Sequence, residues 1–222
     1  MRLFVDTADI EAIRYLYDYY PLDGVTTNPT ILAAAKREPY AVLEDIRNFL
    51  GNEGTLHVQV ISRESEKMVE EAHRICSRLG KNTCIKIPVI PEGLKAIKQL
   101  VKEGLCVTAT GIYTVQQAFL AGKAGAAYAA PYVNRIDNLG VDGVQTVCRI
   151  KSCFDNCRLK TAILAASFKN SQQFLALAEK GIDSATIAPA ILKGMLANEC
   201  VNKAVETFRT DFEALYGESA TM

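Results

Sequence analysis

The 222-residue chain contains no tryptophan and only two histidines, and neither sign of charge is in excess. Its 25 basic and 25 acidic side chains give a formal net charge of zero, so there is no electrostatic reason to expect nucleic acid or an anionic membrane as a partner. With only His57 and His73 available, a histidine-rich zinc site is hard to build. No apolar run approaches the roughly 20 residues that a membrane-spanning helix needs, and we expect no membrane segment.

A signal peptide and a paired-cysteine pattern are also missing. The first residues run directly into a strand-like segment, and we therefore expect a soluble, cytoplasmic protein. The seven cysteines are odd in number, and no Cys-x-x-Cys pair occurs. Four of them lie in apolar-periodic stretches: Cys76, Cys84, Cys106 and Cys148. We expect free buried thiols in a reducing cytosol, and for the neighbours Cys153 and Cys157 the alternative is oxidation or metal binding.

Short β-branched or apolar runs alternate with longer segments of helical period along the whole chain. The eight candidate strands are Leu3–Asp6, Gly24–Thr27, Leu56–Val60, Thr83–Ile87, Cys106–Thr110, Tyr128–Pro131, Thr161–Ala165 and Ser184–Ile187. Eight strand–helix units in one chain of this length predict an α/β fold, a closed (β/α)8 TIM barrel. An open doubly wound sheet is the alternative, but it usually has fewer strands and often a Gly-x-Gly-x-x-Gly turn, which is missing after the first strand.

Several residues mark where helices begin. Asp9 is a candidate N-cap of the first helix, Ser65 of a later one, and Pro91-Glu92 opens another. No linker or low-complexity stretch interrupts the chain, so we expect one domain over residues 1–222. Beyond the eighth unit, residues 199–216 form an amphipathic pattern whose apolar stripe must cover either its own barrel or a neighbour's surface.

The reactive groups of such a barrel gather at the carboxyl ends of its strands. The polar residues at these ends are Asp6, Thr26, Thr27, Asn28, Gln59, Lys86, Thr110, Tyr132, Asn134, Arg135, Ser167 and Lys169. This dense polar set, attached to apolar strands, predicts an active site at that end of the barrel.

Lys86 is the most informative of these residues. The alternation of a strand puts Cys84, Lys86 and Pro88 on one face and Ile85 and Ile87 on the other. The isoleucines must meet the helices, so Lys86 points into the barrel, where desolvation lowers the pKa of an amine and favours a neutral nucleophile. The alternative is a strand-end lysine held in a salt bridge.

The other segments also have structural interpretations. Asn28 before Pro29 is a good helix N-cap in its own right, and Asp6 is equally suited to a turn. His57 lies two residues before Gln59, on the same strand face, and we expect it to fill the barrel beneath the site. Arg135, Ser167 and Lys169 are suited to holding a phosphate, although each basic residue alone is more often a surface charge.

Taken together, these segments resemble the transaldolase family, and within it the small fructose-6-phosphate aldolases. The matching motifs, in family order over most of the chain, are Asp6-Thr7, Gly24-Val25-Thr26-Thr27-Asn28-Pro29, Ile85-Lys86-Ile87-Pro88, Pro131-Tyr132-Val133-Asn134-Arg135 and Ala165-Ala166-Ser167-Phe168-Lys169. The resemblance implies a Schiff-base lysine on the fourth strand, which is where Lys86 falls, and no metal or organic cofactor. It also implies a homo-oligomer, a decamer of two pentamer rings, with the C-terminal helix on a neighbouring subunit.

Three positions separate the aldolases from the transaldolases within this resemblance. Gln59 stands where transaldolases typically have Glu, Thr108-Ala109-Thr110 where they have Asn-x-Thr, and Tyr132 where they have Phe. All three favour an aldolase that reversibly cleaves fructose 6-phosphate to dihydroxyacetone and glyceraldehyde 3-phosphate. A transaldolase that transfers the dihydroxyacetone unit between sugar phosphates is the first alternative. A non-catalytic phosphosugar-binding barrel is the second.

The resemblance also implies a role for each site residue. Lys86 forms the imine, and Tyr132 acts as acid and base with a water held by Gln59 and Thr110. Asp6 assists proton transfer at C2 and, together with Thr26 and Asn28, belongs to the part of the site that binds the three-carbon unit. The distal phosphate is expected at Arg135, Ser167 and Lys169.

Overall fold

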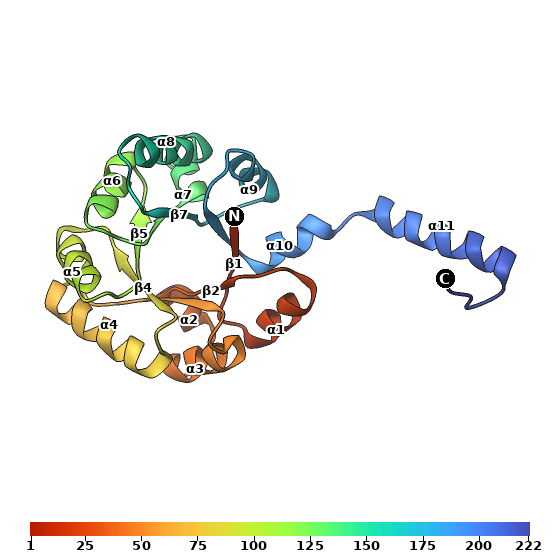
Figure 1. Cartoon of the computed structure of the whole chain (residues 1–222), viewed down its shortest axis with the longest axis horizontal. Helices are drawn as coiled ribbons and strands as arrows, with labels where there is room; N and C mark the ends of the chain where they lie inside the picture. The colour runs from red at the N-terminus through yellow and green to blue at the C-terminus, as the bar shows by residue number, and fades with distance from the viewer.

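The computed structural model covers residues 1–222 and contains a closed barrel of eight parallel strands in the order β1 to β8 (Figure 1). The predicted (β/α)8 fold is confirmed. The strands are β1 Arg2–Asp6, β2 Gly24–Thr26, β3 Thr55–Gln59, β4 Thr83–Pro88, β5 Val107–Ile112, β6 Tyr128–Pro131, β7 Ala162–Ala165 and β8 Ser184–Ile187. Each predicted strand is present, and the bounds differ by at most two residues.

Helices surround the barrel and connect successive strands (Figure 1). They are α1 Ile10–Tyr19, α2 Pro29–Ala34, α3 Pro39–Leu50, α4 Ser65–Leu79, α5 Pro91–Lys102, α6 Val115–Lys123, α7 Val133–Asp137, α8 Gly143–Asn156, α9 Ser171–Ala178, α10 Pro189–Leu196 and α11 Glu199–Tyr216. No helix combines the length and the apolar character needed to cross a membrane.

The alternation of β4 positions the site lysine. Ile85 and Ile87 are fully buried in the large core cluster that strand and helix side chains form together. Burying each isoleucine contributes about 1.5–3 kcal/mol, so turning the strand over would be very unfavourable. Lys86, between them, therefore points into the barrel.

The fifth strand differs most from its predicted bounds, since it begins one residue later and ends two residues later. Gly111 adopts a φ of 72°, in the left-handed region that favours glycine, and the β5–β6 register shifts between Thr110 and Ile112. The strand continues past this irregularity to Ile112, which the alternation pattern alone did not indicate.

The expectation of free buried thiols is wrong for two cysteines. Cys84 and Cys106 form a disulfide, with their Cα atoms 4.6 Å apart. The β4–β5 register pairs Ile85 with Val107 and so places these two cysteines side by side. The other five are free, as expected, but none of them is buried, so that part of the expectation is also wrong. Cys76, Cys148 and Cys153 are partly exposed, and Cys157 and Cys200 are exposed.

One predicted helix cap is also wrong. Ser65 is the first residue of α4 rather than its N-cap, which is Glu64, and no side chain caps that helix. The Ser65 backbone amide instead donates to Glu92 Oε2 on α5 at 3.0 Å. The caps expected at Asp9 and Asn28 are confirmed, because both side chains accept bonds from the first turns of α1 and α2.

The C-terminal helix α11 projects away from the barrel (Figure 1). It spans the expected residues, and none of its side chains is buried. Its exposed apolar residues are Val201, Val205, Phe208, Leu215 and Tyr216. The packing of this helix on a neighbouring subunit stays a prediction.

Candidate active site

A pocket of about 270 Å³ lies at the carboxyl ends of the barrel strands. Its walls come from β1, β3, β4 and β8 and from the segments that follow β2, β6 and β7. The lining residues are Asp6, Asn28, Pro29, Thr30, Gln59, Lys86, Tyr132, Arg135, Ala166, Ser167 and Thr186. Most of the residues predicted for the site are in this set.

Lys86 is buried in the wall of this pocket, with 5 % of its surface exposed. Its Nζ donates to the backbone carbonyl of Thr27 at 2.7 Å, and it takes part in none of the ion pairs of the structure. Burial is the largest influence on the pKa of Lys86 and lowers it, while Asp6 raises it and Arg135 lowers it. The amine is thus free of a counter-ion and biased toward its neutral form.

Tyr132 and Thr110 form the next contact in the site. The Tyr132 hydroxyl and Thr110 Oγ1 lie 2.8 Å apart, within hydrogen-bond distance. The β3–β4 register pairs Gln59 with Lys86, so the amide of Gln59 enters the pocket beside the lysine. The three predicted partners of a water molecule therefore lie in or next to the same pocket.

Asp6 is held by hydroxyl groups of the two neighbouring strands. Thr26 Oγ1, on β2, donates to Asp6 Oδ1 at 2.6 Å. Thr26 Oγ1 also lies 2.6 Å from Thr186 Oγ1 on β8. No protein donor is found for Asp6 Oδ2, which leaves one carboxylate oxygen available to a ligand.

Asn28 has both of the roles that its position suggested. Its Oδ1 accepts from the backbone amide of Ile31 at 3.0 Å and caps α2. The side chain also lines the pocket, and its NH₂ group has no partner within the protein. Capping therefore fixes the orientation in which this amide meets a ligand.

The three residues predicted to hold a phosphate are not all in the pocket. Arg135 and Ser167 line it, and the Arg135 guanidinium carbon lies 4.6 Å from the centre of the Tyr132 ring. Lys169 is exposed and does not line the pocket. The structure thus brings one cation and one hydroxyl to this side of the site.

His57 fills the barrel interior beneath the site, as its position on β3 predicts. It is fully buried, its ring makes edge contacts with Phe4 and Tyr128, and its Nδ1 lies 2.9 Å from Thr108 Oγ1. Burial, with smaller contributions from Lys86 and Arg2, lowers the pKa of His57 to about 3. The imidazole is therefore neutral over the physiological range.

A buried amine, a tyrosine hydroxyl and a carboxylate line one pocket at the mouth of the barrel. The model of the transaldolase/fructose-6-phosphate aldolase family matches residues 3–221 of the chain. The chain belongs to this family. It is therefore an enzyme of the aldolase or transaldolase type.

Two solved structures illustrate how widely the barrel of this family member is shared. One, described as a native KDPGal structure, is 15 % identical over 84 % of this chain and 82 % of that chain, with a TM-score of 0.59. The other is a cube-shaped, highly porous protein cage designed by fusing symmetric oligomeric domains, 13 % identical over 97 % and 78 %, with a TM-score of 0.61. At these identities the likeness concerns the fold alone.

Thr186 and Thr30 line the pocket of this family member but were not predicted for it. Thr186 lies near the end of the eighth strand. The rule that reactive groups lie at the carboxyl ends of the strands, applied to the other strands, would also have selected Thr186. Thr30 is the second residue of α2, which follows a strand end, and no sequence signal distinguishes it from an ordinary first-turn residue.

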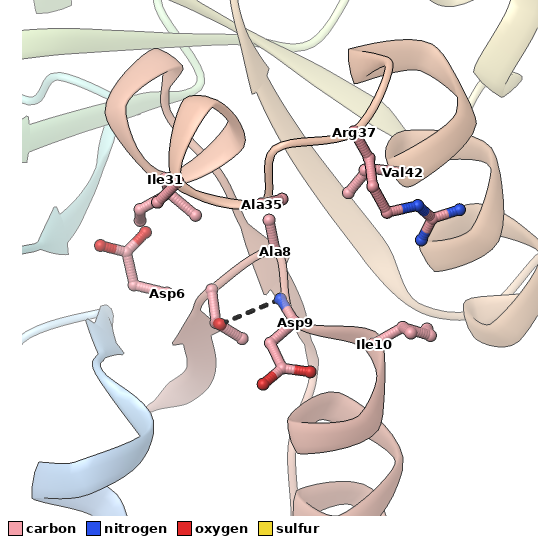
Figure 2. Close-up of a pocket in the computed structure, with 10 residues that line it drawn as sticks. Asp6, Ala8, Asp9, Ile10, Ile31, Ala35, Arg37 and Val42 are labelled. Atoms are coloured by element: carbon pink, nitrogen blue, oxygen red, sulfur yellow. Dashed lines mark hydrogen bonds between the residues drawn. The ribbon is translucent and has the colours of Figure 1, made fainter.

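A larger pocket of about 460 Å³ lies beside the first one, between the start of α1 and α2 (Figure 2). Figure 2 shows the Asp6 carboxylate next to Ile31, with Arg37 and Val42 on the opposite side. Its lining is mostly apolar and, apart from Asp6, contains none of the predicted site residues. For an enzyme of this family, the smaller pocket with the lysine is the better candidate for the reaction.

Proposed function

We propose that this enzyme is a Schiff-base aldolase that reversibly cleaves fructose 6-phosphate to dihydroxyacetone and glyceraldehyde 3-phosphate. The observation that carries the proposal is the state of Lys86: a buried amine without a counter-ion, in the wall of a polar pocket. The matched family includes this activity by its description.

The first half of the reaction uses Lys86 as the nucleophile. Its neutral Nζ adds to the C2 ketone, water leaves, and an iminium forms. A base removes the proton of the C4 hydroxyl, the C3–C4 bond breaks, and its electron pair moves into the iminium to give an enamine. Glyceraldehyde 3-phosphate departs. Protonation of the enamine at C3 and hydrolysis then release dihydroxyacetone and restore the amine.

Tyr132 is the group that we assign to these proton transfers. Gln59 has no titratable proton, so it can position a water molecule but cannot act as the base. The Tyr132 hydroxyl is within hydrogen-bond distance of Thr110, at 2.8 Å, and both the tyrosine and Gln59 line the pocket with Lys86. In this assignment the Tyr132 hydroxyl takes up the C4 proton and later returns a proton to C3 of the enamine.

The remaining polar residues bind the two ends of the sugar. Asp6 and Asn28 line the pocket, and we assign Asp6 Oδ2 and the Asn28 NH₂ group, which have no partner within the protein, to the hydroxyl groups of the three-carbon unit. Arg135 and Ser167 are assigned to the distal phosphate, because guanidinium groups suit phosphate oxygens. Lys169 is left out of this assignment, since it does not line the pocket.

A transaldolase is the second candidate, because the matched family includes both activities. The two functions differ in what happens to the enamine, which water resolves in an aldolase and an acceptor aldehyde resolves in a transaldolase. Supplying fructose 6-phosphate without an acceptor separates them. We expect continuous release of glyceraldehyde 3-phosphate over many turnovers, and Lys86→Met should abolish it. Release that stops after one equivalent per subunit would contradict the aldolase proposal.

The oligomer is a further part of the proposal. The apolar stripe of α11 has no cover within the chain, and Phe208 is 69 % exposed. A second copy of the chain is the cover that we propose, in a decamer of two five-membered rings. Sedimentation should give a particle of about ten chains for the parent and a smaller one for Phe208→Asp. Equal masses for parent and variant would contradict this role of α11.

A further inference from the structure

Asp6 and Lys86 carry opposite charges in their ionised forms and line the same pocket, yet they are not paired. The Lys86 amine donates to the carbonyl of Thr27 instead. An ion pair would favour the ammonium form of Lys86, which cannot add to a ketone. A contact that keeps the carboxylate away from the amine therefore favours the nucleophilic form of Lys86.

The hydrogen bonds of Asp6 show what holds it. A hydroxyl group has a single proton, and the proton of Thr26 is used in the bond to Asp6 Oδ1 at 2.6 Å. In the contact between Thr26 and Thr186, also 2.6 Å, Thr186 must therefore be the donor. The chain of bonds runs in one direction, from Thr186 through Thr26 to Asp6.

The strand order shows on which side of the barrel this chain of hydrogen bonds lies relative to Lys86. β1 lies between β2 and β8, so Thr26 and Thr186 bridge across the strand that carries Asp6. Lys86 lies on β4, three strands further along the barrel wall. Both threonines are buried, at 0 % and 3 % exposure, although Thr186 also lines the pocket. The bond therefore holds Asp6 Oδ1 toward its own side of the barrel.

We propose that the Thr186–Thr26 hydroxyl pair is a positioning device that keeps the Asp6 carboxylate out of an ion pair with Lys86. This inference rests on the proposed Schiff-base function and adds Thr186 as a positioning residue that acts through Thr26. The bond to the carboxylate is charge-assisted, and the second hydroxyl strengthens it by polarising the first.

The other ionisable groups near Lys86 do not offer the same interaction. They are His57 on β3, which is neutral, together with Tyr132 and Arg135 after β6. Of all these groups, Asp6 is the one whose influence raises the pKa of Lys86. Bringing Asp6 closer would increase this influence, whereas none of the others could replace it.

The test uses Thr26→Val and Thr186→Val, which remove a hydroxyl and keep the shape of the side chain. The full-length enzyme is incubated with dihydroxyacetone and cyanoborohydride over a range of pH, and the reduced adduct is measured by intact mass. We expect the pH midpoint of adduct formation to rise by about one unit in Thr26→Val, the low end for an opposite charge nearby. Near neutral pH the trapping rate should fall about tenfold, and Thr186→Val should give a smaller shift in the same direction.

Three control variants separate positioning from damage to the fold. Thr186→Ser keeps the donor and should keep the midpoint of the parent. Ser184→Ala removes another buried hydroxyl of β8, one that donates to the Ile163 carbonyl at 2.8 Å, and should lower stability without moving the midpoint. Asp6→Asn, added to Thr26→Val, removes the carboxylate charge and should return the midpoint toward that of the parent.

The outcomes distinguish this inference from the proposed function. A parent enzyme that forms no adduct at any pH overturns the proposed function itself. If the parent forms the adduct but the midpoint of Thr26→Val equals that of the parent, the hydroxyl pair has no positioning role. Equal shifts in Thr186→Val and Thr186→Ser, or a shift that Asp6→Asn does not reverse, also overturn the inference.

Discussion

Replacing His57 with phenylalanine should make the stability of the enzyme less sensitive to acid. Burial holds the pKa of His57 at about 3 in the native state, against 6.5 in an unfolded chain. Between these values the unfolded state binds a proton that the native state does not, so the free energy of unfolding falls as the pH falls. The difference of about 3.5 units, at 1.36 kcal/mol per unit, corresponds to a loss that approaches about 5 kcal/mol below pH 3.

The magnitude at an accessible pH follows from the same linkage. At about pH 4.5, two units below the unfolded pKa, the titration of His57 should lower the free energy of unfolding of the parent by about 2.7 kcal/mol relative to neutral pH. Phenylalanine does not titrate, and its ring can keep the contacts with Phe4 and Tyr128. His73 is present in both proteins, so its contribution cancels in the comparison.

Urea unfolding followed by circular dichroism, at about pH 7.5 and about pH 4.5 and at one protein concentration, measures this effect. The free energy of unfolding of His57→Phe, minus that of the parent, should increase by about 2.7 kcal/mol when the pH is lowered from about 7.5 to about 4.5. Thr108→Val, which removes the partner of Nδ1 and keeps the histidine, should show the same dependence on pH as the parent. If the free energy of unfolding of the parent and of His57→Phe changes equally with pH, the conclusion that His57 is buried in its neutral form is wrong.

Three further predictions concern the chemistry and the cysteines. Tyr132→Phe should slow cleavage of fructose 6-phosphate by about 10²–10⁴-fold and leave imine trapping largely intact; equal loss of both would remove Tyr132 from the proton transfers. Arg135→Gln should raise KM for glyceraldehyde 3-phosphate by about 10–100-fold, the worth of a charged hydrogen bond, with little change for unphosphorylated glyceraldehyde. Thiol titration of the unfolded, unreduced protein should count five free thiols, since Cys84 and Cys106 are bonded, and seven after reduction. Reduction should also lower the free energy of unfolding by about 3 kcal/mol, as expected for the 22-residue separation.

The barrel and most of the residues that line the candidate site could be predicted because both depend on local patterns. Two outward isoleucines flank Lys86, and this alternation alone orients the lysine. The rule that reactive groups lie at the carboxyl ends of strands then selected Asp6, Gln59 and Tyr132 without any knowledge of register. Local alternation and topology together were sufficient for these residues.

The errors have a different physical origin, because they depend on contacts between distant segments. Cys84 and Cys106 are bonded only because the β4–β5 register sets them side by side, and spacing along the chain does not show register. The backbone amide of Ser65 is bonded by Glu92 on the next helix, a partner 27 residues away. Lys169 follows a strand end in the sequence, but it is exposed and does not line the pocket, and its contact with a phosphate stays a prediction.

The most direct test of the proposed chemistry locates the covalent bond itself. The enzyme is treated with dihydroxyacetone and borohydride, digested, and mapped by mass spectrometry. A reduced three-carbon adduct on Lys86 and on no other lysine, absent from Lys86→Met, is the expected result. An adduct on a different lysine, or one that persists in Lys86→Met, would contradict the assignment of the nucleophile.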